Sequence, residues 1–394
     1  MNRIAAVALT VASMFLIVMA VLVNSSPLFY MTVAVGATLL ASRLQAWLAV
    51  RGLRFERTFP PSVSIGDPVT IETIVWSERR MKRPLVTVED VLPESLQVKD
   101  RVPSLPVAPS FEQPIRTKLT FRALRRGRFH WRNLMVRSTD ALGLGMMEKT
   151  YSSQPVELTV YPVAIPVSVD IRPGNGWGVS DLDSGFVRGA GIDPRGIREY
   201  AYGDPMKHIH WRSSARQGRL MVKEFETGSG LNLSFVVQQT IGSEIGPPGG
   251  TTLEAICGHS LFLAAGYLER GATVWFPGIE KPEEAVSHPE ARNRAIREIL
   301  TDIQANQQST VSQYLQKVNL REGTTLVLFM SVQDPGLPFQ ILSMAGVRVV
   351  CLVYDLKDYD PTTTSPSAAD PGFIAQLESV GAEVHVMPYV QAVS

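Results

Sequence analysis

The chain has 394 residues, of which 45% are hydrophobic, and this is enough for a membrane anchor and two soluble domains. Its 38 Lys and Arg residues nearly balance its 37 Asp and Glu residues, so the net charge of +1 gives no argument for a nucleic-acid-binding protein. The two cysteines, Cys257 and Cys351, lie in apolar runs, which argues against a fold held together by disulfides.

Two apolar runs near the N-terminus predict a transmembrane helical hairpin over residues 1–51. The first run, residues 4–23, has no charged residue, and a helix of that length covers a hydrocarbon core of about 30 Å. In the second run, residues 28–50, the one charged residue is Arg43, which can reach the interface beside Trp47. Because the connection is short, the two spans must be antiparallel.

The arginines around these runs predict their orientation. Basic residues lie before the first run, at Arg3, and at the end of the second, at Arg43, Arg51, Arg54 and Arg57. By the positive-inside rule both ends lie in the cytoplasm, so we expect a multi-pass protein of the cell membrane with cytoplasmic soluble domains. A cleaved signal peptide is the alternative, but the first run is long for one and a second run follows it directly.

Residues 52–168 change to short runs of alternating apolar and polar residues, separated by Gly, Pro and Asp. The alternation at Val69, Ile71, Thr73 and Val75 has the period of a half-buried strand. Runs of this length predict an antiparallel β-sandwich domain.

A basic cluster in this domain admits three interpretations. It could contact anionic lipid, since the domain begins beside the membrane; it could bind nucleic acid; or it could be a solvated strand edge guarded by charge. We expect no nucleic-acid partner and retain these residues as candidates for lipid contact: Arg122, Arg125, Arg126 and Arg128.

The most distinctive segment lies in a predicted connector, residues 169–229. Asp204-Pro205 is typical of a helix start, so we expect a helix from there through His208, Ile209 and Trp211 to about Gly218, and a strand over 220–225. Its many charges indicate a polar network that is either structural or partner-binding. The residues of this motif are Asp193, Arg195, Arg198, Tyr200, Asp204, His208, His210, Trp211, Arg216, Lys223 and Glu224.

Three further expectations concern this motif. Trp211 should pack between the motif helix and the sheet that follows. On a helix, His208 and His210 would lie on opposite faces and could not share a metal ion. Ser213 and Ser214 lack the glycines of a nucleophile elbow, so we expect no catalytic residue here.

Residues 230–394 alternate strand and helix, which predicts a parallel sheet with helices on both faces. One helix has the capping pattern of Thr251 followed by Glu254. No phosphate-binding loop, dinucleotide fingerprint or zinc spacing is present, so we expect no cofactor.

The motif closely resembles the signature of the bacterial and archaeal family called domain of unknown function 58. The similar words are GIDPRGIREYAYGDP and HIHWRSSARQGRLMVKEFE, preceded by RRGRFHWRNLMVRSTDALGLG and a VYP strand. The resemblance implies a von Willebrand factor A-like domain at residues 230–394. In such domains Asp-x-Ser-x-Ser binds Mg²⁺, but Gln238, Thr240 and Gly242 stand at these positions, so we expect no metal.

The leading functional hypothesis is a non-enzymatic, membrane-anchored scaffold or adaptor that binds protein partners. The family resemblance implies a MoxR-type AAA+ ATPase as the partner, in envelope-related assembly or a stress response. Two alternatives stay open: a metal-dependent adhesion-type binding module, and a membrane-bound hydrolase that uses the region of His208 and His210.

Overall fold

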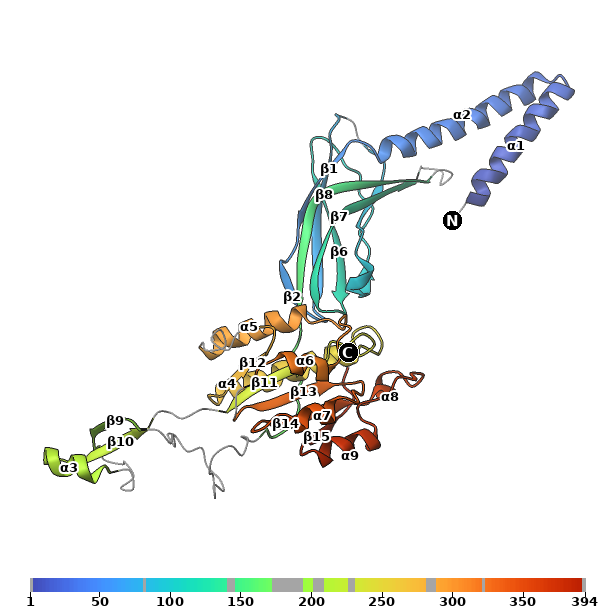
Figure 1. Ribbon diagram of the computed structural model, residues 1–394. Coiled ribbons are helices and arrows are strands. Elements are labelled where there is room, and N and C mark those ends of the chain that lie inside the picture. Colours follow the sequence, from blue (N-terminus) through green and yellow to red (C-terminus); the bar gives the residue numbers. More distant parts are fainter. Residues whose placement is uncertain are drawn as a thin grey trace. The chain divides into compact units, whose positions relative to one another are not determined.

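A computed structural model describes residues 3–80, 83–139, 146–171, 194–200, 209–225, 231–280, 288–320 and 323–391 (Figure 1). It divides the chain into two compact units, Met1–Pro162 and Val163–Ala392.

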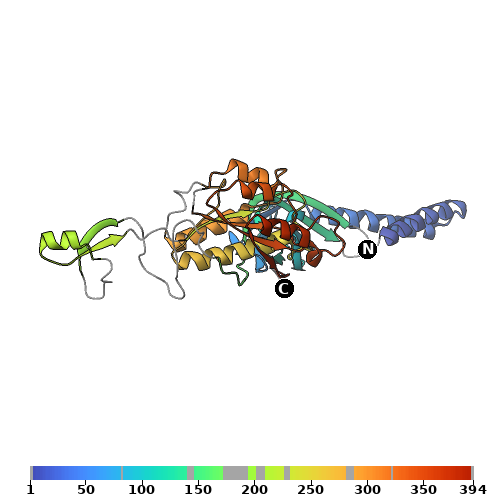
Figure 2. The same ribbon diagram turned by 60° about the horizontal axis from the view of Figure 1, so that its bottom comes forward.

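Two helices open the first unit, α1 (Arg3–Leu22) and α2 (Ser26–Ala49). Residues 4–42 contain no Asp, Glu, Lys or Arg. The two helices contact one another (Figures 1 and 2). Among the described residues, α2 is the one helix long and apolar enough to cross a membrane, and Thr10–Leu22 is a shorter apolar stretch.

Two four-stranded sheets follow, in the orders β1-β3-β6-β5 and β2-β8-β7-β4. In β3 the more buried side chains recur at every second position from Val69 to Ser77, as the sequence predicts. Side chains from both sheets, such as Phe121 and Leu158, meet in one apolar core. The strands are β1 (Leu53–Thr58), β2 (Ser62–Ser64), β3 (Pro68–Ser77), β4 (Val86–Asp90), β5 (Val98–Val102), β6 (Ile115–Ala123), β7 (Gly127–Thr139) and β8 (Met146–Tyr161), with a 3-10 helix at Glu94–Leu96.

One strand pair differs from the predicted antiparallel sandwich. β2 runs parallel to β8, with Val63 opposite Val160. The chain passes from β1 in one sheet to β2 in the other through Phe59, Pro60 and Pro61, so β2 keeps the direction of β1. That direction is also the direction of β8, which makes the new pair parallel.

The second unit contains a five-stranded sheet whose strands are all parallel, in the order β12-β11-β13-β14-β15. The predicted parallel sheet is therefore confirmed. The order of connection reverses between β11 and β13, which makes the carboxyl ends of these two strands the switch point of the sheet. The strands are β11 (Asn232–Val237), β12 (Thr273–Trp275), β13 (Thr325–Met330), β14 (Arg348–Tyr354) and β15 (Glu383–Met387).

Helices cover both faces of this sheet. Phe235 and Phe329 pack on one face with side chains of α4 and α5, whereas Val236 and Leu328 pack on the other with side chains of α6, α7 and α9. This alternation explains why the strands are continuous apolar runs. The helices are α4 (Thr252–Glu269), α5 (Pro289–Asp302), α6 (Val311–Lys317), α7 (Leu337–Leu342), α8 (Leu356–Tyr359) and α9 (Pro371–Ser379).

The segment that leads into this domain lies along α4. The Ile165 amide donates to the carbonyl of Gly258 at 3.0 Å, and the Ile171 amide donates to Tyr267 Oη at 2.7 Å. A side chain at Gly258 would place its Cβ 2.9 Å from the Val163 carbonyl oxygen, a backbone atom, and 2.4 Å from Ile165 Cδ1, so glycine allows this close approach.

A smaller element precedes the five-stranded sheet. It pairs β9 (Pro194–Glu199) with β10 (Met221–Phe225) antiparallel, and α3 (Trp211–Gln217) lies between them in the sequence. The strand predicted over 220–225 is β10.

Candidate functional site

Gln238 follows β11 at the switch point of the parallel sheet and is only 2% exposed. Its Oε1 accepts from the amides of Ser331 at 2.9 Å and Val332 at 3.0 Å, and its Nε2 donates to the Val332 carbonyl at 3.0 Å. The side chain thus joins the carboxyl ends of β11 and β13. A carboxylate could not donate the bond from Nε2, which gives a structural reason for glutamine here.

The side chain of Asp334, in the loop after β13, is also bonded to protein groups. It is 3% exposed, and it accepts from the Ser312 amide at 2.6 Å, from Ser312 Oγ at 3.1 Å and from the Gly336 amide at 3.0 Å. Ser312 lies in the first turn of α6, where a negative charge is favourable. The carboxylate therefore fixes the start of α6.

Thr240 and Gly242, the other positions of the degenerate metal motif, have no acidic side chain to add. Thr240 Oγ1 donates to the Ser309 carbonyl at 3.0 Å, and Gly242 has a φ of +87° in a turn. Across the described residues, no group of three or more His, Cys, Asp or Glu side chains could hold a metal ion.

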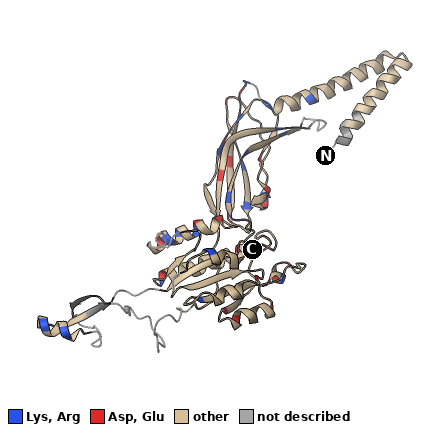
Figure 3. Cartoon of the chain, viewed as in Figure 1, with Lys and Arg blue, Asp and Glu red and all other residues tan. Residues whose placement is uncertain are grey.

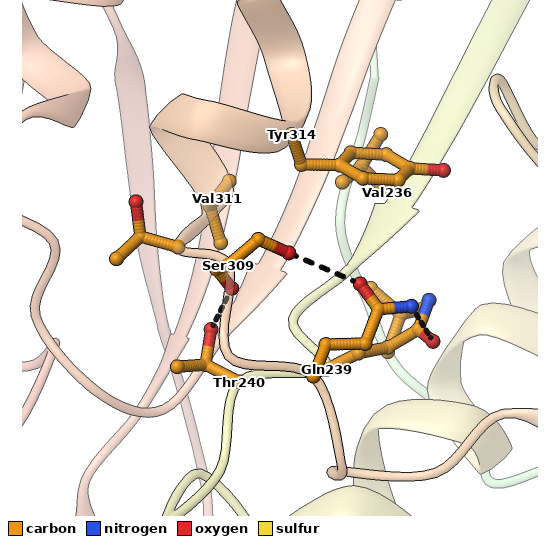
Figure 4. A pocket seen from close by; sticks show the side chains of 9 residues that line it. Val236, Gln239, Thr240, Ser309, Val311 and Tyr314 are labelled. Carbon is orange, nitrogen blue, oxygen red and sulfur yellow. Dashed lines mark hydrogen bonds between the residues drawn. The ribbon is translucent and has the colours of Figure 1, made fainter. Parts of the chain in front are cut away.

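A small cleft opens beside this edge of the sheet (Figure 4). Its volume is about 10 Å³, far below the roughly 300–1,000 Å³ of ordinary ligand sites. Its polar groups bond to one another: Gln307 Nε2 donates to Gln239 Oε1 at 2.9 Å. The cleft is lined by Val236, Val237, Gln239, Thr240, Gln307, Ser309, Thr310, Val311 and Tyr314.

Tyr314 is the only lining residue of this cleft with a titratable side chain. Burial raises the pKa of its phenol, and its Oη donates to the Pro277 carbonyl at 2.5 Å. A phenol in that state is a poor general base at neutral pH. The residues that line the cleft therefore contain no pair of titratable side chains.

The motif helix begins later than the sequence predicts. α3 starts at Trp211, and His210 is its N-cap, with Nδ1 accepting from the Ser213 amide at 3.1 Å. Ile209, expected inside the helix, instead forms a β-bridge with Val222. The predicted start at Asp204 lies outside the described residues. The predicted end is correct, because Gly218 closes the helix with a φ of +67°.

These contacts change the argument about the two histidines. His210 is a cap and not a helical residue, so helical spacing does not decide how it lies relative to His208, which is outside the described residues. The same side chain now has a structural role that explains its presence. Ser214 is also explained: its Oγ accepts from the Met221 amide at 2.8 Å and donates to the His210 carbonyl at 3.1 Å.

The outer face of α3 corrects the prediction for Trp211. This side chain is 65% exposed and does not pack against the sheet, and Arg212 and Arg216 are exposed beside it. The reason is that Ser214, Ile209 and Val222 occupy the buried side of the element. Figure 3 shows basic residues along α3. We call Trp211, Arg212 and Arg216 the α3 face.

The other motif residues lie on or near the two strands. Tyr200 follows β9, and its amide donates to the Leu220 carbonyl at 2.8 Å. Arg198 pairs with Val222 in the β9–β10 register. Arg195 also belongs to β9, and Lys223 and Glu224 to β10; Asp193, Asp204 and His208 lie outside the described residues.

The basic cluster lies at the end of the sandwich away from α2. Arg122 pairs with Pro68 at one end of β3, whereas Leu53, which closely follows α2, pairs with Ser77 at the other end. Arg122 donates to the Gly66 carbonyl at 2.8 Å, and Arg126 is buried. Arg125 and Arg128 belong to the same β6–β7 end. The expected lipid contact assumed that the domain begins beside the membrane, and these arginines lie at the end of the sandwich away from α2.

Arg57, which the sequence analysis counted among the basic residues at the end of the second apolar run, lies inside the sandwich. It is 5% exposed, and its Nη1 lies 2.5 Å from Asp90 Oδ1, which also accepts from Trp131 Nε1 at 2.9 Å. Burial raises the pKa of Asp90, and Arg57 opposes that shift. The sequence contains a signal for this burial. Arg57 is two and four residues from Phe55 and Leu53, so it lies on the same inward side of β1.

Comparison with known proteins supports part of the family resemblance. Residues 196–333 match the family described as "Protein of unknown function DUF58". The match spans β9, α3, β10 and the parallel sheet as far as the loop after β13, which confirms the resemblance over this part of the chain. It includes neither the N-terminal helices nor the sandwich.

One curated relative is "Uncharacterized protein YeaD" of Bacillus subtilis (strain 168). It is 29% identical over 172 residues, which is 42% of this chain and 42% of the relative. The alignment thus spans less than half of either protein.

Two solved structures show weak likeness. A conjugative transposon lipoprotein from Bacteroides eggerthii has a TM-score of 0.16 and 16% identity, covering 26% of this chain and 98% of that one. The SrpA adhesin from Streptococcus sanguinis has a TM-score of 0.17 and 11% identity, and the match covers 27% of this chain and 57% of the adhesin chain. Neither carries an argument about this protein.

Proposed function

We propose that the protein is a non-enzymatic, membrane-anchored adaptor that binds a protein partner through the α3 face. The observation that carries this proposal is Trp211, which is 65% exposed between basic residues inside the segment that matches the family. Tryptophan and arginine are the residues most enriched among binding hot spots. A large aromatic side chain left outside every core is explained by a partner that covers it.

The geometry of α3 supports a defined docking element. Arg212 and Arg216 are four residues apart and share one side of the helix. The backbone is held by the His210 cap, the Ser214 bonds and the Gly218 terminus, so the face is preorganised. Its chemistry calls for an acidic partner surface with an apolar recess for the indole.

The family resemblance suggests a MoxR-type AAA+ ATPase as this partner, acting in envelope-related assembly or a stress response. In this proposal α1 and α2 form a two-span hairpin, and the soluble domains are cytoplasmic. The α/β unit serves as a von Willebrand factor A-like binding domain that needs no metal, in line with the protein contacts of Gln238 and Asp334.

Crosslinking of the full-length protein in native membranes, followed by purification and mass spectrometry, tests this proposal. We expect an AAA+ ATPase in stoichiometric amount, and its loss with Trp211→Ala or Arg212→Glu. Phe339→Ala and Arg294→Glu are matched controls, because both side chains are exposed on helices of the same unit.

Two results would contradict the proposal. One is a partner that is retained by both α3 variants at the wild-type level. The other is a purified protein that turns over a substrate, with activity lost in folded His210→Asn, since an adaptor needs no such reaction.

A further inference from the structure

The end of the sandwich that receives α2 is firmly joined to that helix. Ala49 and Val50 belong to an apolar cluster of the sandwich, and Ala46 is also buried. Tyr151 Oη donates to the Val50 carbonyl at 2.8 Å, and Arg83 Nη1 donates to the carbonyl of Leu48. The sandwich therefore cannot pivot freely about the end of α2.

This joint places the end of the sandwich close to any membrane that α2 crosses. Arg43 and Trp47 are the residues of α2 suited to the interface, and Val50 is the first residue after the helix. Seven residues of helix separate Arg43 from Val50, which is about 10 Å at 1.5 Å per residue. The headgroup region on each side of a bilayer is about 5–8 Å thick, so Val50 lies just beyond it and within a Debye length of its charges.

The side chains at this end are basic and apolar. We call Arg51, Arg54, Arg79, Arg80 and Lys149 the α2-end face; all five are exposed. Their positions follow from contacts near the joint. The Glu78 amide donates to the Gly52 carbonyl at 2.9 Å, Arg51 stacks over the Trp47 ring at 4.0 Å, and Lys149 lies 4.2 Å from the Tyr151 ring.

Exposed apolar side chains accompany these charges. Phe111 is 44% exposed, with the Arg80 guanidinium 5.7 Å from its ring. Leu85 and Met146 are 59% and 54% exposed. Phe111 belongs to this end because the carbonyl of the adjacent Ser110 accepts from the Ser77 amide at 3.0 Å.

Acidic residues at this end do not cancel the basic ones. Glu78 is bonded to Arg54 at 2.9 Å, and this bond lowers the pKa of Glu78. Glu148 pairs with Arg137 at 2.8 Å, and Glu112 is exposed beside Phe111. The excess of positive charge remains.

We propose that the α2-end face binds the headgroups of anionic lipids, with Phe111 inserted among them. The proposal rests on the anchoring of α2 that forms part of the proposed function. Lys and Arg near an anionic surface each contribute attraction that falls off within a Debye length, which suits a face about 10 Å from the helix interface. If this face were exposed only to water, the presence of basic and apolar side chains side by side would have no explanation.

A site-specific fluorescence experiment on the full-length protein tests the inference. The native Cys257 and Cys351 are fully buried, so single introduced cysteines can be labelled in the folded protein. The protein is reconstituted into vesicles of phosphatidylcholine with or without phosphatidylglycerol, and quenching by headgroup-attached nitroxide is measured. The labelled positions are Phe111→Cys at the α2 end and His130→Cys on the exposed far end of β7.

We expect quenching at Phe111→Cys that increases with phosphatidylglycerol, and none at His130→Cys. The pair Arg79→Glu and Arg80→Glu should abolish the increase, whereas Arg122→Glu and Arg128→Glu, the matched charge change at the far end, should not. High salt should also reduce the increase in quenching that phosphatidylglycerol causes at Phe111→Cys. Equal quenching at both positions, or indifference to phosphatidylglycerol, overturns the inference.

A third label separates this inference from the anchor itself. Leu40→Cys lies on α2, where Leu40 is 71% exposed, and acyl-chain nitroxide should quench it if α2 spans the bilayer. If Leu40→Cys is quenched and Phe111→Cys is not, the lipid-binding face alone is wrong. If Leu40→Cys is not quenched, the membrane anchor is wrong.

Discussion

His259 is a buried histidine held against a tyrosine inside the α/β unit. It lies in α4 with none of its surface exposed, and its Nδ1 is 2.8 Å from Tyr354 Oη. Burial lowers the pKa of His259 from 6.5 to about 4. Its Nε2 has no hydrogen-bond partner among the described residues, so a proton there would be a buried charge without compensation.

This pKa predicts that acid destabilises the fold. Below pH 6.5 His259 is protonated in the unfolded chain, whereas in the native protein it stays neutral down to about pH 4. The free energy of unfolding therefore falls as the pH drops through this window. The full loss is about 3 kcal/mol at 1.36 kcal/mol per pH unit. Melting temperatures measured at pH 7 and pH 5 should differ less in His259→Asn than in the wild type. Equal differences in the two proteins would mean that other groups cause the acid effect.

Single residues could be predicted where their chemistry alone decides the outcome. The sequence shows that a neutral Gln238 stands where the resembling domains have an Asp. It does not show the bonds of Gln238 to Ser331 and Val332, which are 93 and 94 residues away in the chain. Trp211 could not be predicted, because an aromatic residue among charges is buried or exposed according to what packs on its helix. Arg57 was counted from sequence as a charge that acts on orientation, whereas its position in β1 is in phase with Leu53 and places it inside the sandwich.

At the scale of elements, the sequence predicts a helix where a capping residue precedes it and a strand where an apolar run marks it. Thr251 starts α4 as predicted, with its Oγ1 accepting from the Glu254 amide at 3.3 Å. The strands of the parallel sheet were found because they are buried on both faces. The parallel pairing of β2 with β8 could not be predicted, since it depends on where the chain crosses between sheets.

The start of α3 is the element that the sequence placed wrongly, and it can be tested directly. His210→Ala removes the acceptor for the Ser213 amide, so α3 should lose about 0.5–2 kcal/mol of local stability. His210→Asn keeps an acceptor at the cap and should lose much less. Amide hydrogen exchange at residues 213–217 measures both. Unchanged exchange in His210→Ala would show that His210 does not stabilise α3 as a cap. The hydrolase alternative for this histidine would then be tested next.

At the scale of the whole molecule, composition and period predict which parts of the chain are helical, which are β and which alternate, but they do not predict how these parts are attached. The helical run, the alternating run and the α/β run are each visible in the sequence. The joint between α2 and the sandwich is not, because Arg83 and Tyr151 reach Leu48 and Val50 across 35 and 101 residues. These contacts decide which end of the sandwich faces the membrane in the proposed arrangement.

The orientation of that arrangement is the last prediction. With Arg57 paired to Asp90 in the core, the charges that act on orientation are Arg3 before the first helix and Arg43, Arg51 and Arg54 at the end of the second. The turn between the helices, residues 23–25, has no basic residue. The positive-inside rule therefore still places both ends in the cytoplasm.

A reporter fused after Ser394 checks this orientation. A fluorescent protein that matures in the cytoplasm should be active there, and a phosphatase that needs an oxidising compartment should be inactive. The same pair of reporters fused after Leu22 should give the opposite result, because that fusion ends beyond a single span. Activity of the phosphatase after Ser394 would overturn the orientation and, with it, a cytoplasmic ATPase as the partner of the α3 face.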